Sequence, residues 1–275
     1  MKLPENGLHD SINEAEYHGD ARSLSSTGAK TLLYQGPRAY RHMKDNPAPH
    51  KPAFDFGSVV HALVLGVGDV EVVHAASWAG KAAKEERDQA RATGATPILA
   101  KDYRIACDMA DAVDSNPLAR SLLTEGRPEV SAWAEDPETG VLLRGRFDYL
   151  NTDNFVDLKT VAGPSDPREF AWAVRKFHYT FQAAYYQRLL QLNGHGPLPP
   201  YWVAVSKDAP YDVYVTRPSD DMLATAHDDV DEALRLYRKC ADTGTWPGLA
   251  DDQQIHTLTD TPWIDPNEQE EVIYG

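Results

Sequence analysis

The N-terminal half of the chain has the spacing of apolar residues that is typical of helices. Residues 24–45 (LSSTGAKTLLYQGPRAYRHMKD) open with Ser and Thr, which are preferred helix N-caps, and Gly36-Pro37 then interrupts the pattern. We therefore expect two short helices there. Residues 54–66 (FDFGSVVHALVLG) are nearly all apolar and predict a buried helix, with Ser58 near its start. Further segments are expected as an exposed helix or a mobile loop over 78–93 and as a helix over 102–114.

The pattern changes to period two at Pro128. Residues 129–136 (EVSAWAED) alternate, PETG supplies a turn, and residues 141–150 (VLLRGRFDYL) continue the alternation, which predicts a β-hairpin. A second turn, NTDN, leads into the apolar segment 155–160 (FVDLKT), so three successive strands predict a meander. A further strand pair is expected over 201–207 and 211–217.

Three more helices complete the predicted order of elements, over about 167–177, 180–192 and 219–240. Helices, strands, helices, strands and a last helix indicate an α/β fold with a central mixed sheet flanked by helices. We expect one domain over residues 1–275. Its ends, 1–20 and 251–275, are expected to be less ordered or to face a partner, since residues 251–275 carry seven carboxylates and no Lys or Arg.

The segment FVDLKT contains two charged residues in an otherwise apolar strand. Because residues two apart on a strand point to the same face, Asp157 and Lys159 project together, while Val156, Leu158 and Thr160 face the other way. Taken alone, the segment favours a surface strand with an ion pair on its solvent side, because D-x-K is short and occurs by chance. A chemical role for the pair is the alternative that neighbouring residues must support.

Asp148 supports the interpretation that Asp157 and Lys159 belong to a reactive site. If the NTDN turn pairs the two strands, Asp148 and Asp157 converge at one edge of the sheet, where two carboxylates repel each other unless a cation neutralises them. Oxygen ligands suit Mg²⁺ or Mn²⁺, and the backbone carbonyl of Leu158 offers a further one. Such an ion activates water and stabilises charge on a phosphoryl group, and Lys159 can orient or deprotonate that water or offset the developing charge.

Two other polar positions lie where a core is expected. His61 is placed inside the apolar helix 54–66, where a core histidine bonded to a carbonyl and a metal ligand are both consistent with the sequence. Gln182 and Tyr186 share one helix face at i, i+4 spacing, as they also would in a half-buried amphipathic helix.

Taken in order, these residues resemble the PD-(D/E)XK nuclease superfamily. The resemblance rests on Asp148, DLK at 157–159, Gln-x-x-x-Tyr at 182–186 and the upstream His61, and it is narrower for the RecB-like branch. It is closest for RecE-type exonucleases, the exodeoxyribonuclease VIII group of phages and prophages, and covers roughly residues 20–265, including TPWIDPNE at 261–268.

The resemblance implies a role for each matched residue. His61, Asp148, Asp157 and the Leu158 carbonyl correspond to metal ligands, and Lys159 to the catalytic lysine. Glu129 corresponds to an upstream acidic residue near the active site. The predicted substrate contacts are Gln182, Tyr186 and Arg146.

The resemblance also implies an activity and partners. Members of this kind are processive 5′→3′ exonucleases that act on double-stranded DNA ends, often as homo-oligomeric rings, beside a single-strand annealing protein in recombination. The implied cofactor is Mg²⁺, with Mn²⁺ as a substitute. Alternatives on the same fold are an endonuclease or end-processing enzyme, or a catalytically silent DNA-binding or scaffold protein.

Composition modifies this picture in one respect. The formal net charge of −15 argues against a generally basic nucleic-acid-binding surface but permits a local basic groove. Basic residues cluster in the first helices and near the motifs, at Lys30, Arg38, Arg41, Lys44, Arg144, Arg146, Arg168, Arg175 and Lys176.

Location and redox chemistry are predicted from what the sequence lacks. No apolar run reaches the roughly 18 residues of a membrane span, and the start MKLPENGLHD is not of signal-peptide type, so we expect a cytoplasmic protein of a bacterium or of a phage-infected host. Cys107 and Cys240 lack metal-type spacing and are expected to be ordinary thiols.

Overall fold

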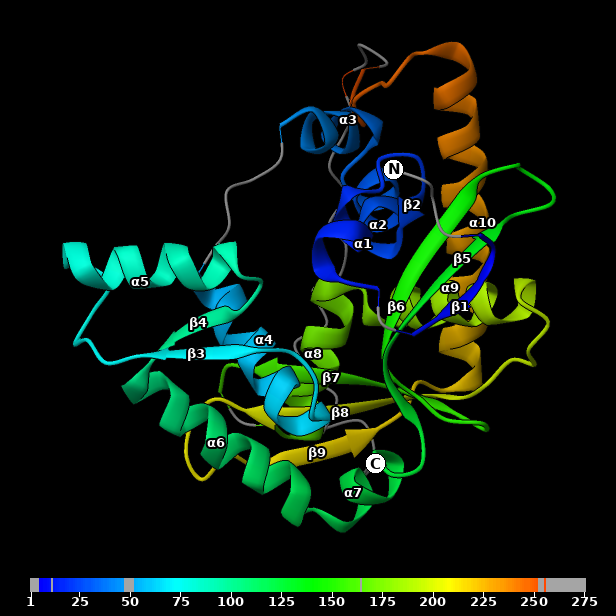
Figure 1. Ribbon diagram of the computed structural model, residues 1–275. Helices are drawn as coiled ribbons and strands as arrows, with labels where there is room; N and C mark the ends of the chain where they lie inside the picture. Colours follow the sequence, from blue (N-terminus) through cyan, green and yellow to red (C-terminus); the bar gives the residue numbers. More distant parts are fainter. Residues whose placement is uncertain (1–4, 11, 47–51, 164, 252–254, 256–275) are drawn as a thin grey trace.

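A mixed β-sheet forms the centre of the protein, with helices on both of its faces (Figure 1). The structure is a computed structural model, and it describes residues 5–10, 12–46, 52–163, 165–251 and 255. The motif TPWIDPNE and nearly all of the predicted acidic end therefore lie outside the described residues. The architecture confirms the predicted α/β fold with a central mixed sheet.

The main sheet has seven strands in the order β1-β5-β6-β7-β8-β9, with β2 paired to β6 off this path. Strands β5, β6 and β7 are antiparallel neighbours, which confirms the predicted meander. Strand β8 runs parallel to β7, and β9 returns antiparallel to β8. The bounds are Gly7–His9 for β1, Leu24–Ser25 for β2, Arg127–Glu135 for β5, Leu142–Leu150 for β6, Phe155–Val161 for β7, Pro200–Ser206 for β8 and Val213–Thr216 for β9.

Two clusters of apolar side chains pack the helices against the two faces of this sheet. On one face, Leu32, Phe147, Leu189 and Val230 belong to a fully buried cluster that joins helices α2, α9 and α10 to the sheet. On the other face, the cluster joins α4 and α6 to β7 and β8, and includes the predicted inward residues Val156 and Leu158. The helix bounds are Ser26–Tyr34 for α2, Pro52–Leu65 for α4, Ala100–Ser115 for α6, Tyr179–Leu192 for α9 and Asp220–Thr243 for α10.

The predicted helix start and break in residues 24–45 are both present. Ser25 is the N-cap of α2, and its hydroxyl accepts a hydrogen bond from the Gly28 amide at 3.2 Å. Gly36 has φ of 93°, a conformation that favours glycine, and Pro37 then begins α3 (Pro37–Asp45). Ser58 lies in the second turn of α4 rather than near its start, because α4 begins at Pro52.

A second, two-stranded parallel sheet extends from the main body beside α4 and was not predicted from the sequence. It pairs β3 (Val70–Val73) with β4 (Thr96–Leu99), and α5 (Lys81–Ala92) connects the two strands. The segment 78–93 thus forms a helix over Lys81–Ala92, preceded by a short turn, rather than a loop. The strands were missed because four residues are too few to establish a period.

The N-terminal segment is more structured than its sequence indicates. Strand β1 pairs with β5, and the short helix α1 (Glu14–Gly19) places Tyr17 in the interior.

The remaining helices are α7 (Pro117–Leu122), which was also missed, and α8 (Pro167–Phe177), whose predicted bounds are confirmed. Within the described residues, no helix combines the length and the apolar character needed to cross a membrane.

Candidate active site

Strands β6 and β7 separate at the position of the two predicted carboxylates. Their register pairs Leu150 with Phe155 and Tyr149 with Val156. The next pair would be Asp148 and Asp157, but no ladder bonding continues there. Instead, the Leu158 amide donates to Asp148 Oδ2 at 2.7 Å, so the carboxylate satisfies a backbone donor that the parting strands leave open.

A third carboxylate belongs to the same row across the sheet. Between β5 and β6 the register pairs Pro128 with Tyr149 and Val130 with Phe147, which puts Glu129 opposite Asp148. Glu129 has φ of 53°, a strained value for a non-glycine residue in a strand. Like charges on directly opposite residues are destabilising, so this row has a cost in the free energy of folding that a bound cation would offset.

Each acid of the row has its own basic partner. Glu129 Oε2 lies 3.6 Å from Arg146 Nη1, and Asp148 Oδ2 lies 3.7 Å from His61 Nδ1. Asp157 Oδ2 lies 2.5 Å from Lys159 Nζ. This last pair confirms that the two charged residues of FVDLKT project to one side, and it is buried rather than exposed at a surface, because only 8% of the Asp157 side chain is accessible.

The donor atoms of His61, Glu129 and Asp148 suit a divalent cation. One ligand atom from each of the three lies within 4.8 Å of the others, and each side chain is partly accessible. Two carboxylates and an imidazole are donors that Mg²⁺ or Mn²⁺ accepts. The structure therefore groups His61 and Glu129 with Asp148, whereas Asp157, predicted as the second ligand, is held by Lys159.

Burial and mutual repulsion alter the pKa values of these acids. Burial, with the charge of Asp148 as a second cause, raises the pKa of Glu129 to about 7. Burial also raises the pKa of Asp148, although His61 opposes this shift. Both pKa shifts mean that the charged form of these two carboxylates is disfavoured, and a bound cation would oppose that effect.

Lys159 is charged despite its burial. Burial lowers its pKa, but the charges of Asp157 and Asp148 outweigh that effect, and the net shift is upward. The ammonium also lies 4.7 Å from the centre of the Tyr179 ring, a cation–π contact that stabilises the charged form. In this environment Lys159 is suited to act as a fixed positive charge rather than as a base.

The predicted pair on α9 contacts this group. Gln182 Nε2 donates to Asp157 Oδ1 at 3.2 Å and to the Tyr186 hydroxyl at 3.4 Å, so the i, i+4 spacing brings both side chains to the site. Gly145 makes the approach of α9 possible. A Cβ atom there would lie 2.8 Å from Tyr186 Cε1 and 2.7 Å from Leu189 Cδ1.

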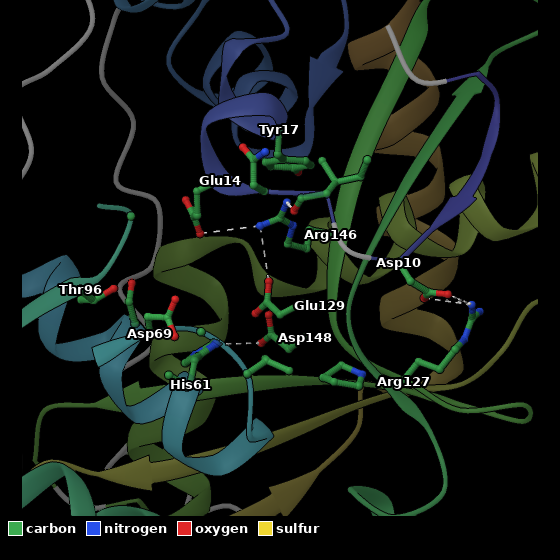
Figure 2. Close-up of a pocket in the computed structure, with 18 of the residues that line it drawn as sticks. Asp10, Glu14, Tyr17, His61, Asp69, Thr96, Arg127, Glu129, Arg146 and Asp148 are labelled. Carbon is green, nitrogen blue, oxygen red and sulfur yellow. Dashed lines mark hydrogen bonds and ion pairs between the residues drawn. The ribbon is translucent and has the colours of Figure 1, made fainter. Parts of the chain in front are cut away.

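The row opens into a cleft of about 870 Å³ between α1, α4 and strands β5 and β6 (Figure 2). His61, Glu129, Asp148, Arg146 and Tyr186 line it, whereas Asp157 and Lys159 do not. Two sides of the candidate site are thus distinguishable: an acidic side facing the cleft, and a lysine side facing α9.

Residues from the N-terminal segment complete the cleft and were not predicted. The Arg146 guanidinium lies 4.4 Å from the centre of the Tyr17 ring and donates to the Ile12 carbonyl at 2.7 Å. Glu14 lies 3.7 Å from the same guanidinium. The N-cap Asn13 and the acidic first turn of α1 were the available signals, but a helix of six residues is too short to show a helical period.

Arg127 and Asp10 form a second unpredicted pair at the rim of the cleft, 3.1 Å apart. Figure 2 shows this pair beside the acidic row.

Several other predicted basic residues have acidic or polar partners away from the cleft: Arg38 pairs with Asp251, Arg41 with Asp45, and buried Arg144 lies against Asp20 and Ser23. The cysteines are free thiols, as expected.

Comparisons with known proteins agree with this geometry. Residues 25–259 match the family described as PDDEXK-like domain of unknown function (DUF3799). None of the curated proteins matches the sequence. The crystal structure of a "Putative exonuclease" from Eubacterium rectale is similar, with a TM-score of 0.64 and 16% identity over 91% of this chain and 96% of that chain. The structure of SSO0001 matches with a TM-score of 0.34 and 13% identity, over 79% and 77% of the two chains, which is too distant to support an argument.

Proposed function

Since the chain belongs to the PDDEXK-like family DUF3799 and has the fold of PD-(D/E)XK nucleases, we propose that it is a metal-dependent nuclease that hydrolyses phosphodiester bonds in DNA. One observation carries the proposal: Glu129, Asp148 and Asp157 lie in one row across β5, β6 and β7, and a buried lysine pairs with the last of them at the point where the strands part. Glu129 and Asp148 face the cleft with basic partners no closer than 3.6 Å, an arrangement that a purely structural role would not require.

His61, Glu129 and Asp148 would hold the cation. Mg²⁺, with Mn²⁺ as a substitute, would lower the pKa of a bound water and stabilise charge on the phosphoryl oxygens. Asp157 and the Leu158 carbonyl remain proposed as further ligands. The grouping of donor atoms supports the first set, and the register of β6 and β7 supports the second.

The remaining residues position and stabilise the substrate. Lys159, kept protonated by Asp157 and Asp148, stabilises the negative charge that develops on the scissile phosphate. Tyr186 is buried with its pKa raised well above the ordinary value, so its hydroxyl remains a hydrogen-bond donor, and Gln182 fixes it. Arg146, held in place by Tyr17 and Ile12, offers a guanidinium to a phosphate at the cleft.

We further propose that the enzyme is an exonuclease that digests linear double-stranded DNA from its ends, with 5′→3′ polarity. Its product would be single strands for recombination by annealing, with an annealing protein as partner and a homo-oligomeric ring as the working form. These finer statements rest on the resemblance of the ordered motifs to RecE-type exonucleases. A likeness in fold to a protein named as an exonuclease supports the nuclease proposal more weakly.

One assay tests the proposal and separates it from its alternatives. The chain is incubated with Mg²⁺ and either linear duplex labelled at its 5′ or 3′ ends or covalently closed circular duplex, with EDTA as the control. Release of 5′ label before 3′ label, from linear DNA only, is the expected result. Cleavage of the circle would indicate an endonuclease, and no metal-dependent cleavage at all would leave a silent DNA-binding or scaffold protein.

A further inference from the structure

Helix α8 exposes two large aromatic side chains to solvent beside the active site. The exposed fractions are 52% for Trp172 and 47% for Phe177, and within the described chain no other aromatic residue is among the exposed large apolar ones. The Lys176 ammonium lies 4.3 Å from the centre of the Trp172 ring and 5.4 Å from that of Phe177. The two rings and the cation thus form one surface group.

The arrangement of α8 shows that this face is not part of the core. Phe170, Ala173 and Val174 are buried, and Trp172 lies on the opposite side of the helix. Phe177 continues the stripe of the buried residues, but it is the last residue of α8 and remains 47% exposed there. Trp172 and Lys176 are four residues apart, so they lie about one helical turn apart on the same side of α8. Arg175 precedes Lys176 in the sequence. We call Trp172, Arg175, Lys176 and Phe177 the α8 aromatic face.

The charge of this face differs from that of the molecule as a whole. Among the residues that the structure describes, neither Arg175 nor Lys176 forms an ion pair, whereas Arg38 and Arg41 do. On a chain with a net charge of −15, a pair of uncompensated cations next to exposed rings is a local exception. It complements a partner that carries negative charge and flat apolar groups together.

The α8 aromatic face continues without interruption to the lysine side of the candidate site. The Phe177 ring stacks on the Tyr179 ring, with centroids 5.7 Å apart and an angle of 27° between the planes. Tyr179 in turn lies under the Lys159 ammonium at 4.7 Å. Lys30 Nζ donates to the Phe177 carbonyl at 3.2 Å and adds another cation to this path.

We propose that the α8 aromatic face binds single-stranded DNA adjoining the scissile phosphate, an inference that rests on the proposed nuclease function. Bases stack on Trp172 and Phe177, and the phosphates between them are attracted by Arg175 and Lys176. A duplex fits this surface poorly, because its bases are stacked on one another and paired. The face therefore distinguishes the separated strand from the intact duplex.

Equilibrium binding in EDTA tests this without any need for cleavage. The probe is a fluorescein-labelled oligothymidylate of about 16 nucleotides, within the range of single-strand site sizes, and the readout is fluorescence anisotropy. Trp172→Ala/Phe177→Ala should weaken its binding by about tenfold or more, as expected when stacking rings are removed, while blunt duplex of the same length loses little affinity. Lys176→Gln should flatten the plot of log K against log salt by about 0.7 for each phosphate that the variant no longer neutralises.

Leu118→Ala is the matched control. Leu118 is 64% exposed on α7, so this variant also removes an accessible apolar side chain, and its binding should equal that of the wild type. Because Trp172 and Phe177 are both half exposed, the double variant should fold, and its thermal unfolding is measured alongside.

Three results would overturn the inference. The first is unchanged binding of oligothymidylate by the double variant, and the second is an equal loss of affinity for duplex and single strand. The third is a change in the molecular mass of the double variant by light scattering, which would make the face an interface between copies.

The two proposals fail separately. A wild type that cleaves DNA, with a double variant that binds single strands normally, refutes only this one. A wild type that never cleaves, with binding that depends on the rings, refutes only the nuclease proposal.

Discussion

Asp148 and Asp157 occupy adjacent strands at the same position in register, yet the protein treats the two carboxylates differently. Asp148 faces the cleft, accepts a hydrogen bond from a backbone amide and has a raised pKa. Asp157 is turned toward α9 and is held by Lys159 of its own strand and by Gln182 of α9. One acid is left in need of a cation, and the other has a cation built into the chain.

The difference separates a side of the site that is complete without a ligand from a side that would need one. A buried ion pair such as Asp157–Lys159 compensates its own charges, so this side of the centre is formed without any ligand. Among the residues that the structure describes, the basic partners of Glu129 and Asp148 are Arg146 and His61, both more than 3.5 Å away, which leaves room for a metal. The comparison predicts that variants on the two sides have different effects.

The largest effect is expected from Asp148→Asn. The amide keeps the shape of the side chain but removes its charge from the centre of the row, so Mn²⁺ binding measured by calorimetry and DNA cleavage should both fall by at least about 10²-fold. Asp153→Asn, an exposed acid in the turn between β6 and β7, is the control and should behave as wild type. Wild-type Mn²⁺ affinity in Asp148→Asn would remove this residue from the proposed metal site.

Lys159→Met should separate chemistry from metal binding. Loss of one charge that stabilises a transition state lowers the cleavage rate by about 10²–10³, while Mn²⁺ affinity persists because lysine is not a ligand. The same change leaves Asp157 buried without its cation, so the free energy of unfolding should fall by about 3–5 kcal/mol.

The double variant Asp157→Asn/Lys159→Met checks the cause of that loss. It should recover most of the lost stability in urea denaturation, but none of the activity. If Lys159→Met cleaves DNA at the wild-type rate, the ion pair is structural and the catalytic role of Lys159 is wrong.

His61→Ala should have a smaller effect, confined to the acidic side. Loss of one imidazole from a set that also offers Glu129 and Asp148 is expected to weaken Mn²⁺ binding by about 10–100-fold, with little change in melting temperature because the side chain is about one quarter exposed. A core histidine would give the reverse: a lower melting temperature with unchanged Mn²⁺ affinity and cleavage.

The smallest effect concerns Glu129 in the metal-free protein. Its pKa is about 7 when folded, above the ordinary value of 4.5, so between these two pH values the native state binds more protons than the unfolded state. The free energy of unfolding in EDTA should therefore decline as pH rises from about 4.5 to 7, and Glu129→Gln should lose that component. Glu135→Gln, which removes an exposed acid at the end of β5, is the control for the loss of one carboxylate.

Much of the fold follows from local sequence because its signals are repeated several times within each element. The hairpin, the segment FVDLKT and helices α8, α9 and α10 all have strong periods or clear caps, and they were predicted within a few residues. Strands of two to four residues, such as β2 and β3, contain no such repetition. The N-terminal segment was missed for the same reason.

The sequence by itself determined which polar residues share an element and a face. Strand period two set the common side of Asp157 and Lys159, and helical spacing set that of Gln182 and Tyr186. The resemblance named His61, Glu129 and Arg146 as site residues, but only the tertiary structure decided how their elements meet. It placed Glu129 opposite Asp148 with a strained φ, brought His61 of α4 to Asp148, and packed Tyr17 against Arg146. Local spacing fixes directions along one element, whereas distances between elements depend on register and packing, which are properties of the whole folded chain.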